Sequence, residues 1–433
     1  MTPSKIILSF VASACVATLS SAMEFQVLGA KAASMGGAGI AASPSSLAAY
    51  NNPALLANNP EKFSLHVGAG IGLKDTGAGK AVGDLNNLGL SEIIDAADLT
   101  TNPAGLTPAQ EASLIQAQGI ISGMNSKGFQ VNPTVDLAIS FGSFGTGIFL
   151  TSDIGGVANI DQNHLALILE DSAAPGTYYD ILNPSTTPTS TDYTNTSLEY
   201  AINTGLTNLD VVGLAVVEIP LAYGYALDTG YGALAVGGAL KYMKGQTFYK
   251  KVDIDSDNAL DNLSDNSVNS STFGIDLGLT FKPTKVENLT LALVGKNLNT
   301  PTFDVSALAK TQGISDYEIK PAIRAGAAYK LGEVVEFAFD ADLTENKSLV
   351  GYNTRYVGGG ANFDLSALEL NVGLMKNIAS NDEAGVIYTA GLATGPDWFH
   401  FELSAQMASK SGEVDGTSYP KQAMVNFAIS SAF

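Results

Sequence analysis

The chain has 433 residues, of which only 15% are charged, and its formal net charge at pH 7 is −20. This acidic balance disfavours nucleic-acid binding, which relies on surfaces rich in Lys and Arg. The single cysteine, Cys15, allows neither an internal disulfide nor a cysteine-rich metal site. After Ala22 no run of about eighteen apolar residues occurs, which excludes a membrane-spanning helix in the rest of the chain.

The first residues, 1–22, have the layout of a secretory signal peptide. Lys5 precedes an apolar run over 6–19, and small residues then lead to Ala22. We expect cleavage after Ala22, so that residue 23 begins the mature chain. Cleavage before Cys15, as in a lipoprotein, is the alternative, but the large aliphatic residue usual three positions before such a cysteine is missing.

The segment 23–60 lacks the alternation that marks strands and is rich in Gly, Ala, Ser and Pro. Ser43-Pro44 would begin a short helix, and Pro53 would end it or begin another. The segment has too few apolar residues for a core of its own. We therefore expect it to plug the lumen of a larger closed structure.

From residue 61 to the end, apolar residues alternate with small or polar ones. In 273–281, for example, Phe273, Ile275 and Leu277 alternate with Gly and Asp. A period of two places one set of side chains on each face of a strand. Strands of about nine to eleven residues can cross a bilayer when tilted. Fourteen such segments follow one another: 63–73, 133–141, 144–154, 216–227, 231–245, 271–282, 287–296, 320–331, 333–344, 354–364, 367–377, 385–394, 397–408 and 421–433.

The links between these segments alternate strictly in length. The links after even-numbered segments have only a few residues, whereas those after odd-numbered segments are longer: 74–132, 155–215, 246–270, 297–319, 345–353, 378–384 and 409–420. Short periplasmic turns, long outer loops and an even strand number are what a bacterial barrel requires. The sequence therefore predicts an all-β fold, an antiparallel up-and-down transmembrane β-barrel of about 14 strands over 61–433 with an N-terminal lumen plug.

The last residue, Phe433, ends an alternating segment that also contains Val425, Phe427 and Ile429. A chain that ends on an aromatic residue in a strand resembles a bacterial outer-membrane β-barrel, in which the final strand closes the barrel and is read by the assembly machinery. We therefore expect the protein to reside in the outer membrane of a Gram-negative cell. Its expected partners are outer-membrane lipid and the barrel-assembly machinery, and we expect no nucleic-acid partner. An edge strand of a soluble sheet is the alternative for this segment taken alone.

Two family resemblances are specific. The run Met-Gly-Gly-Ala-Gly-Ile-Ala at 35–41, followed by Asn52-Pro53-Ala54, resembles the N-terminal hatch of the long-chain fatty-acid transporter (FadL) superfamily, whose barrels have fourteen strands. The later half, through 293–298, 320–329 and 340–347, is similar to the outer-membrane family named conjugal-transfer TraF. A periplasmic thioredoxin-like protein shares that short name, but this chain has no Cys-x-x-Cys.

The resemblance implies a binding or docking role for the plug motif, formed by Gly36, Gly37, Gly39, Asn52, Pro53 and Ala54. It also implies passive uptake of hydrophobic small molecules through a plugged barrel. The alternative is a non-transporting envelope component of a conjugation or secretion apparatus. The first function predicts an apolar pocket that joins plug, wall and outer loops, and the second predicts a filled or polar lumen.

The period of two also assigns a set of charged residues to the lumen face: Arg324, Lys330, Asp340, Asp342, His400 and Glu402. A turn at Leu331-Gly332-Glu333 would place Arg324 directly opposite Asp340. We therefore expect an ion pair between these two side chains inside the lumen. The alternative is that both side chains line a wet lumen without touching.

Nothing in the chain predicts an enzyme or a cofactor. The three histidines are His66, His164 and His400. Ser404 lies close to His400, but the third group that would orient a catalytic Ser/His pair is missing. We expect the lumen histidines to be hydrogen-bonded to neighbours.

One acidic segment resembles the start of a calcium loop through Asp253, Asp255 and Asp257. The position that needs Gly is Asn258, and the position that needs Glu is Ser264. We therefore expect a solvated acidic loop, with the metal site as the weaker alternative, and no other metal site.

Two segments of the first long loop, 90–99 and 108–121, have the apolar spacing of amphipathic helices. Helices at the outer mouth could shelter a low-affinity site for a hydrophobic ligand. The alternative is simple packing over the mouth of the barrel.

Overall fold

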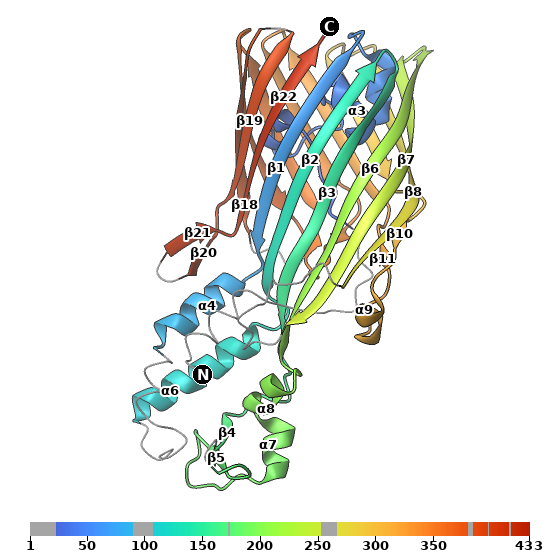
Figure 1. Cartoon of the computed structure of the whole chain (residues 1–433). Coiled ribbons are helices and arrows are strands. Elements are labelled where there is room, and N and C mark those ends of the chain that lie inside the picture. Colours follow the sequence, from blue (N-terminus) through green and yellow to red (C-terminus); the bar gives the residue numbers. More distant parts are fainter. Residues whose placement is uncertain are drawn as a thin grey trace.

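The computed structural model describes residues 23–89, 107–171, 174–252, 266–379, 384–396, 398–414 and 417–433. Within these residues fourteen antiparallel strands form a closed barrel (Figure 1), and the first strand pairs with the last. The strands are β1 Ser64–Asp75, β2 Gly128–Phe141, β3 Phe144–Asn159, β6 Asn208–Thr229, β7 Gly232–Val252, β8 Ser267–Pro283, β9 Leu289–Lys296, β12 Ala322–Leu331, β13 Val335–Asp342, β16 Tyr356–Asp364, β17 Leu368–Asn377, β18 Val386–Thr394, β19 Phe399–Ala408 and β22 Gln422–Ala432.

The predicted all-β barrel is confirmed, with all fourteen segments in the expected order. The main difference is that β6 and β7 have 22 and 21 residues and reach further outward than the predicted strands. Residues 210–214 of β6 are buried on both faces, because outer loops cover the side that would otherwise face lipid or solvent. Alternation disappears there, and the predicted strand therefore began eight residues late, at residue 216 instead of Asn208.

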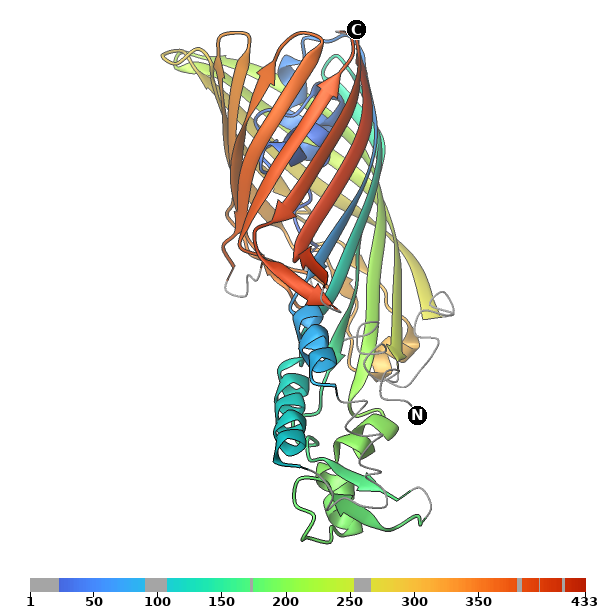
Figure 2. The same cartoon turned by 90° about the vertical axis from the view of Figure 1, so that its left-hand side faces the viewer.

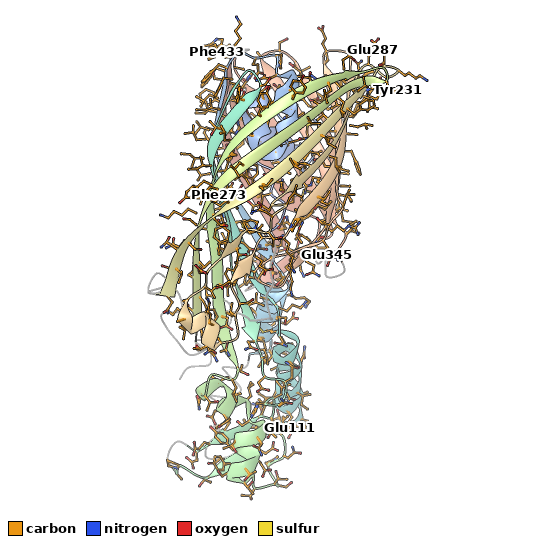
Figure 3. The ribbon with its side chains drawn as sticks, turned by 90° about the vertical axis from the view of Figure 1, so that its right-hand side faces the viewer. Glu111, Tyr231, Phe273, Glu287, Glu345 and Phe433 are labelled. Atoms are coloured by element: carbon orange, nitrogen blue, oxygen red, sulfur yellow. The ribbon has the colours of Figure 1, made fainter. Side chains whose placement is uncertain are left out.

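The outward face of the barrel is apolar, as a lipid-facing wall requires. Along β8 the side chains of Phe273, Ile275 and Leu277 are exposed, whereas Asp276 between them is fully buried in the lumen. Figure 3 shows Phe433, Tyr231 and Glu287 at one end of the barrel and Glu111 beyond the opposite end. We call the end with Phe433 and the short turns the periplasmic end, following the usual arrangement of such barrels.

The residues 23–60, here called the hatch, lie inside the barrel (Figures 1 and 2). The hatch contains two short α-helices and two 3₁₀ helices: α2 Ala30–Ser34, η1 Ser45–Leu47, α3 Ala48–Asn51 and η2 Pro53–Asn58. The side chain of Asn52 caps η2 by accepting a hydrogen bond from the Ala54 backbone at 3.1 Å. The predicted signal peptide, 1–22, lies outside the described residues.

The outer loops carry the remaining elements, and those of the first two outer loops form a group beyond the barrel (Figure 2). They are α4 Ala78–Asn87, α6 Pro108–Gly123, β4 Ile168–Glu170, β5 Tyr178–Asp180, α7 Ser190–Thr196, α8 Leu198–Asn203, β10 Thr302–Phe303, α9 Ala307–Thr311, β11 Tyr317–Glu318, β14 Asn346–Lys347, β15 Asn353–Thr354, β20 Ser411–Val414 and β21 Thr417–Pro420. The helix predicted at 108–121 is confirmed as α6, which begins with a capping box at Thr107. The helix predicted at 90–99 lies outside the described residues. Among the described helices, none combines the length and apolar character needed to span a membrane.

The predicted register between β12 and β13 is wrong by two residues. Arg324 lies opposite Asp342, and Asp340 lies opposite Gly326. The turn comprises Gly332, Glu333 and Val334, one position later than predicted. A shift of two residues leaves every side chain on its predicted face, so the pattern of alternation could not detect it.

Phe433 leads to a prediction about assembly. Its side chain is 64% exposed on the outside, and its ring stacks on Trp398 at 6.1 Å between centroids. Its burial against lipid should therefore contribute only about 1.5–3 kcal/mol. We expect Phe433→Ala to lower the amount of barrel in the outer membrane of cells, while the purified variant refolds in detergent nearly as the parent does. Immunoblots that find equal amounts of both proteins in the outer membrane would contradict this.

Candidate functional site

The hatch is held against the wall at two places where the wall carries glycines. At the first, Gly36 lies on β16 and β17, where Gly360 and Gly373 face each other across the ladder. A Cβ atom added to Gly360 would lie 2.7 Å from the Met35 Cα atom. Gly36 itself has a φ of +70°, a conformation that favours glycine. At this place the backbone of the plug motif therefore packs directly against the backbone of the barrel wall.

The second place receives the Asn52-Pro53-Ala54 element. Gly224, Gly237 and Gly278 form a continuous row across β6, β7 and β8. A Cβ atom added to Gly237 would lie 2.5 Å from the Pro53 carbonyl oxygen, closer than real Cβ contacts allow. Asn52 also donates hydrogen bonds to the carbonyls of Ile40 at 2.8 Å and Leu279 at 3.4 Å. This part of the motif thus joins two turns of the hatch to the wall.

Side chains of the wall then hold the hatch backbone. The carboxylate of Asp340 accepts hydrogen bonds from the amides of Gly39 at 2.8 Å and Ile40 at 3.1 Å. It can lie across β12 because its neighbour there, Gly326, has no side chain. Thr389 accepts a hydrogen bond from the Gly36 amide at 3.0 Å. Asp340 therefore binds the backbone of the hatch and does not pair with Arg324. This explains why Arg324 does not form the predicted ion pair with Asp340.

Arg324 forms its ion pair with Asp342, at 2.7 Å between Nε and Oδ1. Its guanidinium also donates to the carbonyls of Gly37 and Phe25, each at 3.4 Å. Both members of the ion pair are buried. Arg324 therefore links β12, β13 and the start of the hatch.

A double-mutant cycle should measure this pairing. We expect the coupling energy between Arg324→Ala and Asp342→Ala to be about 1.5–3 kcal/mol, as for hydrogen bonds between charged groups. The same cycle with Asp340→Ala should give a clearly smaller coupling. Denaturant unfolding in detergent gives each free energy, and the reverse order of the two couplings would contradict the observed register.

A buried lysine cluster lies deeper in the lumen. The ammonium of Lys241, which is completely buried, is 2.8 Å from Glu218 and 3.0 Å from Asp276 and donates to Asn297 at 2.7 Å. Lys296 lies nearby with its Nζ atom 3.1 Å from the centre of the Tyr50 ring. No motif or spacing in the sequence predicted this cluster. The available signal was the presence of Glu218 and Asp276 at lumen-facing positions of otherwise regular strands.

The first residues of the described chain form a strap, residues 23–28, along the outer side of the hatch. Glu24 forms an ion pair with Lys74 at 2.9 Å, and Gln26 donates to the Ser152 carbonyl at 3.4 Å. Phe25 packs beneath the Arg324 guanidinium, 4.0 Å from the ring centre. The strap is thus held to the wall by charge and by aromatic contact.

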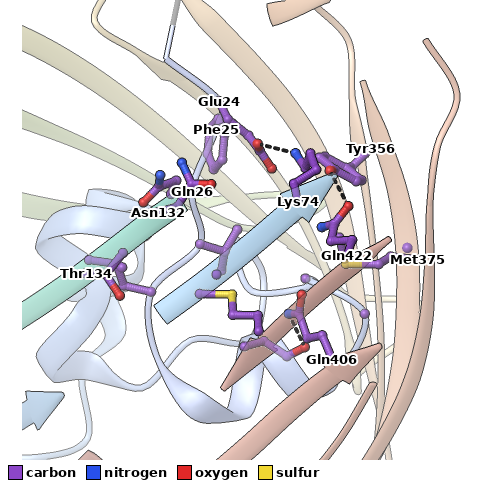
Figure 4. Close-up of a pocket in the computed structure, with 18 of the residues that line it drawn as sticks. Glu24, Phe25, Gln26, Lys74, Asn132, Thr134, Tyr356, Met375, Gln406 and Gln422 are labelled. Carbon is purple, nitrogen blue, oxygen red and sulfur yellow. Dashed lines mark hydrogen bonds and ion pairs between the residues drawn. The ribbon is translucent and has the colours of Figure 1, made fainter. Parts of the chain in front are cut away.

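The strap borders a cavity of about 90 Å³ on the outer side of the hatch (Figure 4). Figure 4 shows Gln406 and Gln422 facing this space beside the strap. The other lining residues mix apolar and polar groups and include Val27, Leu28, Thr134, Arg324, Asp340, Tyr356, Met375 and Met424. A lining of apolar surface with a few polar groups is typical of a site for a small, largely apolar ligand.

A second cavity, of about 380 Å³, lies on the periplasmic side of the hatch, near the start of β1 and the end of β22. It is strongly polar, and among its lining residues are Lys31, Glu61, Lys330, Glu336, Glu369, His400 and Glu402. The charged residues predicted in the lumen are therefore divided. Arg324 and Asp340 border the outer cavity, whereas Lys330, His400 and Glu402 border the periplasmic one.

The wall is interrupted beside the outer cavity. Between β2 and β3 the residues Asn132-Pro133 and Ser152-Asp153 drop out of the ladder, because Pro133 has no amide hydrogen to donate. Two side-chain hydrogen bonds span the interruption, from Asn132 to the Ser152 carbonyl at 2.9 Å and from Ser152 to the Pro133 carbonyl at 2.7 Å. Asn132 also lines the cavity. The interruption is thus closed by side chains instead of a continuous backbone ladder.

The histidines do not form catalytic groups in the described residues. His66 lies buried 3.2 Å from Asp136, and His164 lies in an outer loop 3.1 Å from Asp161. Ser404 accepts a hydrogen bond from Asn426 at 3.0 Å. The described residues contain no group of three side chains suited to hold a metal ion. The calcium-like segment with Asp253, Asp255 and Asp257 lies outside the described residues.

Comparison with known proteins places this geometry in a family. The family model described as "F plasmid transfer operon, TraF, protein" matches residues 49–342, more than half of the chain. The chain belongs to this TraF family. The matched region runs from α3 of the hatch to the end of β13, and it includes Asn52, Lys241, Lys296 and Arg324. No curated protein sequence matches the chain.

This TraF-family barrel also resembles solved structures. The toluene transporter TbuX of Ralstonia pickettii aligns with a TM-score of 0.50 at 10% identity, covering 95% of this chain and 99% of that chain. The CymD monoaromatic hydrocarbon channel aligns with a TM-score of 0.51 at 13% identity, with the same coverage of 95% and 99%. These likenesses confirm the fold, which is that of the FadL-type outer-membrane barrels.

Proposed function

We propose that this protein takes up hydrophobic small molecules passively through a plugged barrel in the outer membrane. The observation that carries the proposal is the outer cavity of about 90 Å³ beside the side-chain-closed interruption at Asn132-Pro133. The hatch occupies the lumen below this cavity and is docked backbone to backbone at two sites. A solute in the cavity therefore meets two side-chain hydrogen bonds on the way to the wall, but tightly packed backbone on the way through the hatch.

The chemistry of such a route suits apolar solutes. A solute that leaves between β2 and β3 would enter the hydrocarbon layer, where an apolar molecule is more stable than in water. The hydrogen bonds from Asn132 and Ser152 would have to open transiently, and each contributes only about 0.5–1.5 kcal/mol net. TbuX is a toluene transporter and CymD is a monoaromatic hydrocarbon channel, which supports the same class of solute for this chain.

Uptake by outer-membrane vesicles tests the proposal. Vesicles that contain the full chain should accumulate labelled toluene and a labelled long-chain fatty acid faster than vesicles without it. Labelled sucrose, a polar control of small size, should enter both kinds of vesicle at the same rate. Equal rates for all three solutes with and without the protein would overturn the proposal.

A second function is a non-transporting envelope component of a conjugation or secretion apparatus. The observation that favours it is the outer unit over 162–206, which extends beyond the barrel and whose flanking residues Asp161 and Thr207 are joined by a 3.0 Å hydrogen bond. This function predicts that deletion of 162–206 lowers plasmid transfer in mating assays while the barrel remains in the membrane. Unchanged transfer would count against it.

A further inference from the structure

The polar cavity on the periplasmic side of the hatch is bordered by an arc of three carboxylates. Glu369 on β17 and Glu402 on β19 lie in one row, because both pair with Ala393 of the strand between them. Neighbouring strands are about 4.8 Å apart, so the backbones of these two residues are separated by about 10 Å. Glu336 on β13 pairs with Asn362, which donates a hydrogen bond to the Glu369 carboxylate at 3.0 Å. The wall therefore presents three carboxylates to one cavity.

The hatch already places one ammonium group against this arc. The Nζ atom of Lys31 lies 2.7 Å from the Oε2 atom of Glu336. Glu369 and Glu402 accept hydrogen bonds from an amide and a hydroxyl group, both of which are neutral. In the described part of the chain, only Glu336 of the three carboxylates therefore has a cation within ion-pair distance. An added ammonium group could pair with either of the other two.

Two carboxylate oxygens that border the cavity lack a partner among the described residues. Glu336 is only 8% exposed, and its Oε2 atom has a partner whereas its Oε1 atom has none. The Oε2 atom of Glu61 is buried and accepts no hydrogen bond. A carboxylate oxygen that is removed from water without gaining a donor costs free energy. A ligand that brings N–H donors into the cavity would recover this cost.

The charges that border the cavity define the charge of its ligand. The carboxylates are Glu61, Glu336, Glu369 and Glu402, and the ammonium groups are Lys31 and Lys330. With His400 neutral, the cavity therefore has two negative charges in excess. We infer that it binds an aliphatic diamine as a dication, with one ammonium group at Glu402 and the other between Glu369 and the Oε1 atom of Glu336. The site lies on the opposite side of the hatch from the uptake route proposed above and does not depend on it.

Calorimetry on the full chain in a non-ionic detergent at pH 8, where an imidazole is neutral, tests this with two ligands of equal length. Cadaverine has two ammonium groups, and 5-amino-1-pentanol has a hydroxyl group in place of one of them. The second charged contact should make cadaverine bind about tenfold more tightly. Glu402→Gln should bring the two affinities close together, because glutamine keeps the size of the side chain but not its charge. Lys330→Met should strengthen cadaverine binding, because it removes a competing cation.

Glu111→Gln is the control, because Glu111 lies on α6 beyond the opposite end of the barrel (Figure 3). It should preserve the tenfold preference, and loss of the preference in this variant would overturn the inference in favour of general surface charge. Equal binding of both ligands to the parent chain, no binding of either, or a preference that survives Glu402→Gln would also overturn it. Weaker cadaverine binding by Lys330→Met would contradict the argument from charge. The shift of the folded barrel in unheated gels shows that each variant is folded.

Discussion

Gly237→Val should raise ion conductance through the barrel, and a chain without residues 24–60 should raise it several-fold. The added side chain would collide with the backbone of Pro53 and Ala54, where the hatch lies against the row of glycines on β6, β7 and β8. The barrel wall itself does not depend on this contact, because its strands pair around a complete circle. The hatch should therefore loosen while the barrel still inserts. Planar-bilayer recordings measure the effect.

Gly238→Val is the matched control for this variant. Gly238 is the next residue of β7 and faces outward, where an added Cβ atom would meet only ordinary contacts with Leu277, at 3.6 Å. Its conductance should equal that of the parent chain. A Gly237→Val barrel or a hatch-deleted barrel with parental conductance would show that the hatch does not close the lumen.

Lys241→Met should lower the free energy of unfolding by about 3–5 kcal/mol, because it leaves Glu218 and Asp276 charged and buried without their partner. Methionine has a similar length, so the change removes the charge with little change in packing. Urea unfolding of the barrel in lipid vesicles measures the loss. The triple variant with Glu218→Gln and Asp276→Asn should recover much of it, because no unpaired charge then remains.

Lys244→Met serves as the control for Lys241→Met. Lys244 lies three residues further along β7 with an exposed, outward-facing side chain. Its replacement should change the free energy of unfolding by no more than about 0.5 kcal/mol. If the two variants are equally stable, the buried cluster does not contribute as argued.

Alternation made the strands predictable, because a wall with lipid on one side and a packed lumen on the other requires a period of two. It was weakest in segments 231–245, 287–296 and 354–364, and the structure gives the reason for the first and the third of these. Gly237, Gly358 and Gly360 stand at lumen positions where the hatch backbone leaves no room for a side chain. The glycines that blurred the strand pattern are therefore those that receive the plug motif.

The parts of the site that could not be predicted from the sequence depend on the pairing register of the strands and on segments without a periodic structure. The period of two predicted that Arg324, Asp340 and Asp342 face the lumen. Because both aspartates share that face, it could not predict which of them pairs with Arg324. That choice depends on Gly326, which lets Asp340 reach the hatch amides. Phe25 lies in a segment without periodicity, so no pattern could bring it to Lys296 and Arg324.

A disulfide lock across the wall tests the account most directly. With Cys15 removed by the expected cleavage, Pro133→Cys and Ser152→Cys would be the only cysteines of the chain, and they face each other across the interruption between β2 and β3. The control pair, Ile139→Cys and Thr146→Cys, lies in the continuous part of the same ladder. We predict that oxidised vesicles with the first pair lose toluene uptake, that reductant restores it, and that the control pair retains uptake throughout. Full uptake with the first pair oxidised would contradict passage through the wall.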